Sequence, residues 1–564
     1  DGMKIYNPFH AFGTFSVFDG DLLKSTEVYT GAFPPGFGGR LSSVVNMITR
    51  DGRATELNAQ ADVNFLSAKL QMEGPVAEGI QLLVSGRKSL FPRSLTRFVG
   101  RETPLSFYDG FVKLTRSTET DARFSVQGFF SGDDLISDRD DEPDYRWRTG
   151  AVGFNVAGLI QDRIFLRAIG FQNTFSARRD PKSSLRVTPA STNITEGGVR
   201  LEATYYTDEQ NLYFFGFEFG FPEFEYRLQN NLGVERRLFS SDAEVSVWLR
   251  YQRLFGRWKV DGGIHSNVTA LFARPQIQNA LQPRISLSYR FVEHWLVKAS
   301  YGRFTQHYVT VNNEDDVISI FDAWIKVPQD LDVERADHYV AGIEGNLGST
   351  VFCSFQVYTK QYGSLVVYNR NKVDALDPDY ISGNGSSSGF ETLLRAALPS
   401  ADLYASYALG RASVESAGLT YAPRYDRRHH VNVLAQVRPL DHVELSARWE
   451  LGSGFPFSET AGYYDRLTLG DIFNGPFVSE TGIPYAILGP KNAARLPAYH
   501  RLDLSASYTL VIPLGDHSLR ATTGLQLINV YDRSNILYFD RSTGQKFTML
   551  PFFPSASLTV EYSR

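Results

Sequence analysis

Cysteine is almost missing from this sequence: Cys353 is the only one among 564 residues. A single thiol excludes an internal disulfide, and it leaves no pair of cysteines with the spacing of a zinc or iron–sulfur site. Long apolar runs are missing too. No stretch approaches the roughly 18 consecutive apolar residues that a membrane-spanning helix needs, so such a helix is not predicted.

An excess of one charge is also missing. Lys and Arg number 57 against 62 Asp and Glu, and the formal net charge is −5. The basic residues are spread along the chain rather than clustered, so nothing indicates a nucleic-acid-binding protein. The ten histidines are scattered, and the pair His429–His430 is predicted to start a strand, where neighbours face opposite sides and cannot chelate one metal. No catalytic arrangement was found, and an enzyme is therefore not predicted.

Aromatic side chains are abundant, with 41 Phe and 29 Tyr, and many segments alternate between apolar and polar residues. In RLDLSASYTL (501–510), Leu502 and Leu504 share one face while Arg501 and Asp503 share the other. A period of two predicts a β-strand. Ionisable residues inside many strands suit a water-filled lumen better than a dry core. The segments 442–451 and 557–563 repeat the pattern, which predicts Leu445, Trp449 and Leu558 on a lipid face and Arg448 and Glu450 on an inward face.

Short and long connections alternate along the chain, as in outer-membrane β-barrels. Ten short turns joining pairs of strands are predicted at 77–79, 117–120, 160–162, 207–210, 255–256, 292–294, 347–350, 399–402, 439–441 and 513–516. One further strand at each end, near 55–65 and 555–563, brings the predicted number to 22. The fold class is therefore an all-β membrane protein, a 22-stranded antiparallel transmembrane β-barrel. A barrel of this size has a lumen too wide for its own side chains to fill.

The residues resemble a known family, the TonB-dependent outer-membrane receptors, especially Bacteroidota-type members. FGGRLSSVVNMITRDG (37–52) is similar to the end of their plug domain, and residues 1–34 to the segment before it. Further similar stretches follow in the same order along the chain: MEGPVAEGIQLLVSGRKS (72–89), ADHYVAGIEGNL (336–347), GNGSSSGFE (383–391), YDRRHHVNV (425–433), RLPAYHRLDLSASY (495–508) and LINVYDRSNI (527–536).

The resemblance implies two domains, the C-terminal half of a plug at 1–52 and the barrel at 53–564. It implies that the first half of the plug is absent from this chain, together with the segment that contacts TonB. It also implies the outer membrane of a Gram-negative bacterium as the location. The expected partners are outer-membrane lipid and lipopolysaccharide, TonB through the missing segment, a small ligand and other outer-membrane proteins.

Three functions are compatible with these features. The first is a TonB-dependent active transporter that imports a scarce ligand, such as a metal chelate, a cofactor or a small oligomer, when TonB rearranges the plug. The second is a barrel that serves as a structural or partner-binding subunit of an outer-membrane assembly. The third, a passive pore, is disfavoured because a plug fragment is present.

Three groups of residues are candidates for binding or for holding the plug. Asn7-Pro8 breaks the chain after Ile5, and the apex that follows is expected to present Tyr6, Phe9, His10 and Phe12 to the ligand, helped by external loops 305–330 and 454–498. The alternative is that these rings pack against the barrel. Arg40 and Arg50 are each expected to pair with a carboxylate of the barrel wall, the alternative being arginines solvated in a wet lumen.

The third group is acidic. SGDDLISDRDDEPDYRW (131–147) falls in the third external loop and is a candidate Ca²⁺ site, with the ligands Asp133, Asp134, Asp138, Asp140, Asp141 and Glu142. The alternative is a solvated acidic loop, bridged to lipopolysaccharide by divalent ions. No other cofactor is expected. The glycine-rich GNGSSSG (383–389) is predicted to be an external loop, and Tyr358, Tyr407 and Tyr508 are predicted to lie in aromatic girdles at the membrane interfaces.

Overall fold

The structure is a computed structural model of the whole chain. It describes residues 1–10, 13, 15–90, 105–118, 122–137, 143–182, 188–229, 235–268, 281–311, 321–372, 374, 376–466, 483–539 and 546–563.

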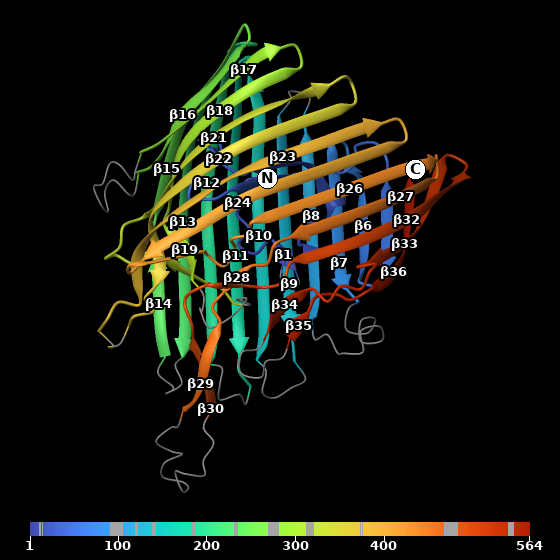
Figure 1. Cartoon of the computed structure of the whole chain (residues 1–564). Coiled ribbons are helices and arrows are strands. Elements are labelled where there is room, and N and C mark those ends of the chain that lie inside the picture. The colour runs from blue at the N-terminus through green and yellow to red at the C-terminus, as the bar shows by residue number, and fades with distance from the viewer. Residues whose placement is uncertain are drawn as a thin grey trace.

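Most of these residues form one closed antiparallel barrel (Figure 1). Its ends meet where β36 pairs with β5, with Leu558 opposite Val63. The described residues contain 22 barrel strands, as predicted. They are β5 (Asn58–Asn64), β6 (Ser67–Ala77), β7 (Ile80–Ser89), β8 (Leu105–Ser117), β9 (Arg123–Leu135), β10 (Asp144–Ile160), β11 (Ile164–Asp180), β12 (Ala190–Asp208), β13 (Asn211–Gln229), β15 (Glu244–Phe255), β16 (Trp258–Asn267), β17 (Leu281–Val292), β18 (Trp295–Gln306), β21 (Glu334–Leu347), β22 (Val351–Tyr368), β23 (Tyr380–Leu398), β24 (Ala401–Ser416), β26 (His429–Leu440), β27 (Val443–Gly452), β32 (Tyr499–Leu514), β33 (His517–Ile528) and β36 (Phe553–Ser563).

The ten predicted turns are confirmed, since each joins two consecutive barrel strands. These turns lie together at one end of the barrel, the short-turn end, which is at the top and right of Figure 1. The longer connections lie at the other end, the loop end. Within the described residues they carry small pieces of strand, which are β14 (Glu235–Ser241), β19 (Tyr308–Val311), β20 (Ala323–Lys326), β25 (Leu419–Tyr421), β28 (Pro456–Phe457), β29 (Thr460–Arg466), β30 (Ile483–Leu488), β31 (Ala494–Arg495), β34 (Ile536–Phe539) and β35 (Lys546–Thr548).

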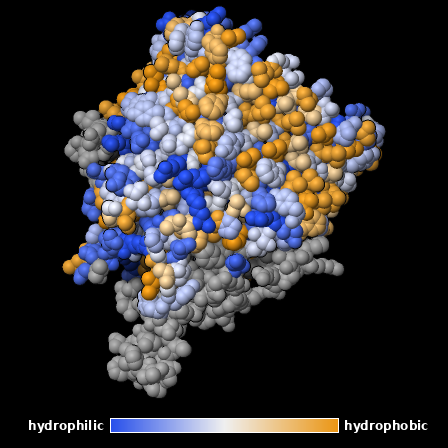
Figure 2. All heavy atoms as spheres, in the orientation of Figure 1, coloured by the Kyte–Doolittle hydropathy of each residue, from blue (hydrophilic) through white to orange (hydrophobic). Residues whose placement is uncertain are grey.

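The two faces of the strands are occupied as the alternation predicts. Leu445 is 43% exposed and Leu558 is 47% exposed on the outer face, and Trp449 lies opposite Leu502 in the register between β27 and β32. The predicted inward facing of Arg448, Arg501 and Asp503 is confirmed, because all three line a cavity of about 250 Å³ together with Phe15 of the N-terminal segment. Glu450 lies opposite Arg501 in the register and therefore shares this inner face. Figure 2 shows apolar side chains spread over the upper and right part of the visible wall.

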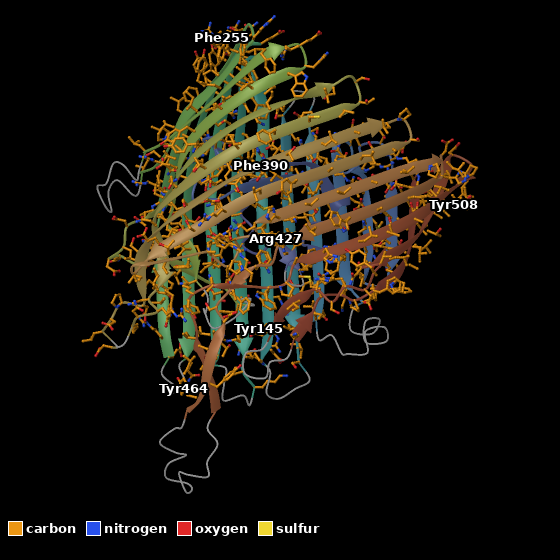
Figure 3. The ribbon with its side chains drawn as sticks, viewed as in Figure 1. Tyr145, Phe255, Phe390, Arg427, Tyr464 and Tyr508 are labelled. Carbon is orange, nitrogen blue, oxygen red and sulfur yellow. The ribbon has the colours of Figure 1, made fainter. Side chains whose placement is uncertain are left out.

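Aromatic side chains lie at both ends of the wall, with one exception to the prediction. Phe255 and Tyr508 lie at the short-turn end (Figure 3), and both rings are more than 40% exposed. Tyr407 shares the outer face of β24 with exposed Leu403 and is hydrogen-bonded to His429 at the loop end of β26.

Tyr358 is the exception, and the prediction that it lies in a girdle is wrong. Its neighbours Phe355 and Val357 are exposed on the outer face, so Tyr358 faces the lumen. There the Nζ of Lys360 lies 5.6 Å from the centre of its ring.

The prediction that 383–389 is an external loop is also wrong, because these residues lie inside β23. Their small size has a packing reason. A Cβ atom at Gly389 would lie 2.2 Å from the carbonyl oxygen of Leu409 and 2.8 Å from the Tyr358 hydroxyl. The glycine therefore makes room for a neighbouring strand and for a ring in the lumen.

Residues 1–52, here called the lumen segment, form β1 (Phe9–His10), β2 (Phe15–Ser16), the 3-10 turn η2 (Gly20–Leu22), β3 (Leu23–Tyr29) and β4 (Val44–Thr49). Their hydrogen bonds and ion pairs reach β6, β7, β8, β9, β11, β12, β13, β16, β17, β18, β21 and β22. A segment of this length contacts so many strands of a closed ring only from the inside. In the described part of the chain, no helix is long and apolar enough to cross a membrane.

The two faces of β26 supply a matched test of orientation. Val433 is 38% exposed on the outer face, opposite Trp449, whereas Asn432 lies on the inner face opposite Glu450. Val433→Arg is expected to lower the free energy of unfolding by about 2–4 kcal/mol, because a charge then faces hydrocarbon. Asn432→Arg is expected to change it by less than about 1 kcal/mol, since the guanidinium meets water and a carboxylate. Urea unfolding in lipid vesicles measures both; equal losses would contradict the orientation.

Candidate functional site

The first residues of the lumen segment are held by buried carboxylates of the barrel wall. The Nζ of Lys4 lies 2.5 Å from an oxygen of Glu196 on β12 and 3.1 Å from one of Glu218 on β13. The hydroxyl of Tyr6 donates to the other oxygen of Glu196 at 2.6 Å. The side chain of Glu196 is only 2% exposed, so these two donors take the place of the water that would otherwise bond to the carboxylate.

An aromatic cluster surrounds Tyr6 on the loop side. Its ring makes edge contacts with Phe224 of β13 and Trp324 of β20, with ring centres 6.1 and 5.3 Å apart. Tyr308 of β19 stacks on Phe224 at 4.1 Å. The hairpin of β19 and β20 belongs to a connection at the loop end, so this connection folds back toward the lumen segment. Rings with a few polar groups are typical of a surface that binds small molecules.

His10 lies in a closed polar box. It is 0% exposed and bonded on both sides, by its Nδ1 to Asp133 of β9 at 2.8 Å and by its Nε2 to Asp109 of β8 at 3.2 Å. The Nε of Arg87 donates to the same oxygen of Asp109 at 2.8 Å. Burial lowers the pKa of His10, but the hydrogen bonds to Asp109 and Asp133 outweigh it, so its pKa lies above the ordinary value.

The turn at residues 33–39 is held through its backbone oxygens. Arg284 of β17 is 4% exposed and donates to the carbonyl oxygens of Pro34 and Phe37, each at 2.6 Å. The Nδ1–H of His265 donates to the carbonyl oxygen of Pro35 at 2.8 Å. A Cβ atom at Gly38 would lie 2.4 Å from the same imidazole, so only glycine fits there.

The end of the lumen segment is held by ion pairs near the short-turn end. Arg50 pairs with Glu73 of β6, whose side chain is 3% exposed. Asp51 pairs with Lys113 of β8 at 3.2 Å and with Arg123 of β9. Burial raises the pKa of Asp51, but the two cations outweigh this effect and hold its pKa below the usual range. These contacts join the chain to the wall just before the first barrel strand.

The four predicted ligand residues are found in different environments. Tyr6 is partly buried in the aromatic cluster, and Phe9 is 52% exposed. The prediction that His10 is presented to the ligand is wrong, because the two carboxylates described above enclose its ring. Phe12 lies outside the described residues. Tyr6 and Phe9 stay candidates, and Trp324 from predicted loop 305–330 joins them.

The two arginines expected to pair with the wall behave differently. Arg50 contacts a wall carboxylate, Glu73. For Arg40 the expectation is wrong within the described part of the chain. Its guanidinium donates to the carbonyl oxygen of Gly39 at 2.7 Å and lies 5.5 Å from the ring centre of Trp324, so an aromatic face takes the place of the carboxylate.

Of the six predicted calcium ligands, the structure describes Asp133 and Asp134, and these two do not come together. Asp133 and Asp134 are neighbours on β9 and therefore point to opposite faces. Asp133 faces His10, and Asp134 accepts from Arg148 at 2.6 Å on the outer face. The described residues contain no group of three side chains that suits a metal. Asp138, Asp140, Asp141 and Glu142 lie outside the described residues.

Several residues of this site were not predicted from the sequence, above all Lys4, Asp51, Asp109 and Arg284. The contacts of Lys4 and Arg284 join residues about 190 to 250 positions apart in the chain. No local motif marks such pairs. One signal was available, because Lys4 and Asp109 have apolar or small neighbours in the sequence, and a charged residue in such a context usually needs a partner of opposite charge.

Comparison with known proteins agrees with this architecture. Residues 91–530, more than three quarters of the chain, match the family described as "TonB dependent receptor-like, beta-barrel". No match was found among curated proteins. The solved structure of the FrpB iron transporter from Neisseria meningitidis (F3-3 variant) is similar, with 13% identity and a TM-score of 0.69 over 98% of this chain and 89% of that chain.

Two further solved structures are similar at the same level. The ferric citrate transporter FecA in the unliganded form has 12% identity and a TM-score of 0.67, over 99% of this chain and 86% of that chain. The chain matched in the FpvAI–pyocin S2 complex has 11% identity and a TM-score of 0.67, over 99% of this chain and 79% of that chain. At such identities the likeness concerns the fold alone.

The box around His10 predicts a pH-dependent attachment of the β1–β2 hairpin. Because the pKa of His10 is raised in the folded protein, its stabilising effect is complete below the unfolded value of about 6.5 and is lost as pH rises through the folded pKa. Hydrogen exchange of the amides in the hairpin, corrected for intrinsic rates, is expected to accelerate over that range.

His10→Asn is expected to weaken the attachment at low pH by about 1.5–3 kcal/mol, since it removes the charge-assisted hydrogen bond to Asp133. It should also abolish the pH dependence. His442→Asn serves as the control, because His442 contacts Tyr508 instead of the lumen segment. A hairpin whose exchange has the same pH profile in wild type and His10→Asn would contradict this role.

Proposed function

We propose, from the premise that this chain belongs to the TonB-dependent receptor family and lies in the outer membrane of a Gram-negative bacterium, that it is an active transporter. It would take up a scarce small ligand from outside, and force delivered through TonB would rearrange the lumen segment. No enzymatic activity is proposed. In this assignment the loop end faces the outside and the short-turn end faces the periplasm.

We further propose that residues 1–52 act as the C-terminal half of a plug and residues 53–564 as the barrel. The observation that carries the proposal is the way the lumen segment is held. Its contacts with the wall are mainly ion pairs and hydrogen bonds to charged groups, such as those of Lys4, Arg50 and Asp51. A segment that occupies the lumen argues against a passive pore.

The strength of these contacts supports an energised step. Hydrogen bonds to charged groups contribute about 1.5–3 kcal/mol each, so several broken together cost on the order of 10 kcal/mol. Thermal motion alone would release such a segment rarely. Polar contacts are nevertheless suited to reversible release, because water can replace each partner when the segment moves.

We propose the aromatic cluster at the loop end as the ligand site. Tyr6 and Trp324 are its candidate contacts, and Phe9, which is 52% exposed on β1, is a further candidate outside the cluster. A ring surface with nearby charged groups suits an uncommon small molecule such as a metal chelate, a cofactor or a short oligomer. The names of the similar solved structures, an iron transporter and a ferric citrate transporter, make ferric chelates the first probes to test.

A disulfide between lumen segment and wall tests the transport step. A Cβ atom at Gly31 would lie 3.4 Å from a methyl carbon of Val340 on β21. Gly31→Cys/Val340→Cys, in a Cys353→Ser background, is therefore expected to form a tether. In energised cells, uptake of radiolabelled ferric chelates, with ferric citrate first, is expected to fall at least about tenfold and to recover with reductant.

The single variants Gly31→Cys and Val340→Cys are the matched controls. A protonophore should stop uptake by wild type as completely as the tether does. Uptake that persists with the disulfide formed, or that ignores the protonophore, would rule out an energised rearrangement of the lumen segment.

A partner-binding role is the second candidate, and the hairpin of β29 and β30 favours it. This hairpin extends beyond the rim of the barrel in Figure 1, and Tyr463, Tyr464 and Ile487 are each about half exposed. Tyr463→Ser/Tyr464→Ser is expected to leave ferric-chelate uptake unchanged if import is the function. Loss of a co-purifying outer-membrane protein in this variant, with no uptake in wild type, would favour the partner-binding role.

A further inference from the structure

A row of residues on the inner wall lies directly beneath residues 30–42 of the lumen segment. Arg284 of β17 lies opposite Gly263 of β16 on one side and Gly302 of β18 on the other. Gly302 lies opposite His338 of β21, and His338 lies opposite Lys360 of β22. Residues opposite each other share a face of the sheet, so these five residues, here called the lumen row, lie side by side on five neighbouring strands.

Arg284 is 4% exposed, and its partners are oxygen atoms without a charge. Its Nη1 donates to the carbonyl oxygens of Phe33 at 3.3 Å and of Pro34 and Phe37 at 2.6 Å each. Its Nη2 donates to the side-chain oxygen of Gln282 at 3.1 Å. In the described part of the chain, its Nε–H has no hydrogen-bond partner and no carboxylate forms an ion pair with it.

Lys360 is held in the same way. Its Nζ donates to the carbonyl oxygens of Thr30 at 2.5 Å and of Ser42 at 3.3 Å. Among the described residues it has no ion pair either. The lumen segment supplies no carboxylate at this place, because it has no acidic residue between Glu27 and Asp51.

The other charged contacts of the lumen segment are balanced. Lys4 and Arg50 pair with wall glutamates, and Asp51 pairs with two wall cations. At the lumen row, neutral carbonyl oxygens satisfy N–H groups but leave the positive charges without compensation. Such a charge is costly in a site that only has to hold the segment, and one acidic residue among 30–42 would remove the cost. The row is therefore better suited to an anion than to the chain that covers it now.

The wall around Arg284 leaves room for such an anion. Glycine lies on both sides of it, and other groups fill the space that side chains would take. A Cβ atom at Gly263 would lie 2.9 Å from a ring carbon of Pro35, and one at Gly302 would lie 2.7 Å from the ring of Phe304. The same Phe304 ring lies against the guanidinium, whose carbon is 4.4 Å from the ring centre. Once the lumen segment moves away, a recess remains with Arg284 at its floor.

We propose that the lumen row binds the carboxylate groups of an anionic ligand after residues 30–42 have moved away. The row is then a second site along the path of the transported molecule. This inference rests on the proposed transport function and adds the ligand class, a small molecule with several carboxylate groups.

The geometry of the row supports a ligand with more than one such group. Arg284 and Lys360 are three strand spacings apart, about 14 Å at the backbone, and both have long side chains. The guanidinium fork matches the two oxygens of a carboxylate, and a charge-assisted hydrogen bond is about twice as strong as one to a neutral carbonyl.

The experiment measures hydrogen exchange of residues 30–42 in the complete protein in detergent, during a citrate titration at constant ionic strength. The amides of Ala32 and Leu41 report on release, because they donate to His338 and Gln306 of the wall. A ligand that binds only the uncovered row favours the released state, so citrate is expected to accelerate exchange at least about threefold. Trimethyl citrate, the neutral ester, is expected to leave exchange unchanged.

Variants of the row test which groups bind the citrate. Arg284→Gln/Lys360→Gln is expected to abolish the response to citrate, whatever its exchange rate without citrate. Lys360→Gln alone removes a partly buried side chain and is expected to lower the response. Arg250→Gln is the matched control and is expected to keep the full response. Arg250 lies opposite Gly263 on β15 but is already paired with Asp261, at 2.7 Å.

The tethered protein Gly31→Cys/Val340→Cys supplies a second measurement. Its response to citrate is expected to disappear when the disulfide forms and to return with reductant, because the row stays covered while the tether holds. Heat-dependent migration in electrophoresis checks that every variant is folded.

Several outcomes would each overturn the proposal. They are no acceleration by citrate in wild type, equal acceleration by trimethyl citrate, a full response in Arg284→Gln/Lys360→Gln, a lost response in Arg250→Gln, and a response that persists with the tether formed. The measurement needs no uptake, so failure of the transport function and failure of the anion site are told apart.

Discussion

Hydrocarbon offers no partner for a backbone N–H or C=O group, and this constraint shapes the whole molecule. The backbone N–H and C=O groups of each barrel strand bond to the two neighbouring strands. The pairing of β36 with β5 closes the ring and removes the last free edges. Closure at 22 strands then creates a second requirement, since the ring is too wide for wall side chains to fill. The lumen segment meets this requirement, and its sequence is adapted to a polar wall.

The contacts inside the lumen follow from the same closure. The inner face of the strands carries charged groups, and these find partners either in side chains of the lumen segment or in its backbone. Arg284 and His265 donate to carbonyl oxygens of the turn at 33–39, so part of the attachment depends on the path of the chain more than on its side chains. Gly38 is required because an imidazole occupies the space that its side chain would take.

Neighbouring residues of one strand serve two different environments. Asp133 of β9 encloses His10 in the lumen, and Asp134 accepts from Arg148 on the outer face. The strand period of two separates these roles by one residue, and the wall between them is a single sheet thick. Outer-wall and lumen features can therefore change independently in such a barrel, apart from the backbone they share.

The pattern of adjacent residues determined the architecture. Alternation and short turns predicted the number of strands, all ten turns and the inward facing of Arg501 and Asp503. They could do so because strand period and turn chemistry are properties of adjacent residues. The same reasoning failed for Tyr358 and for 383–389, where a ring in the lumen and the small residues beneath it depend on each other across β22 and β23. It also failed for His10, Arg40 and the pair Asp133 and Asp134. Their partners come from strands 99 and 123 residues away, from an aromatic face, or from opposite sides of the wall. Only the closed barrel decides which distant groups meet, because closure sets which inward side chains surround the lumen segment at each level.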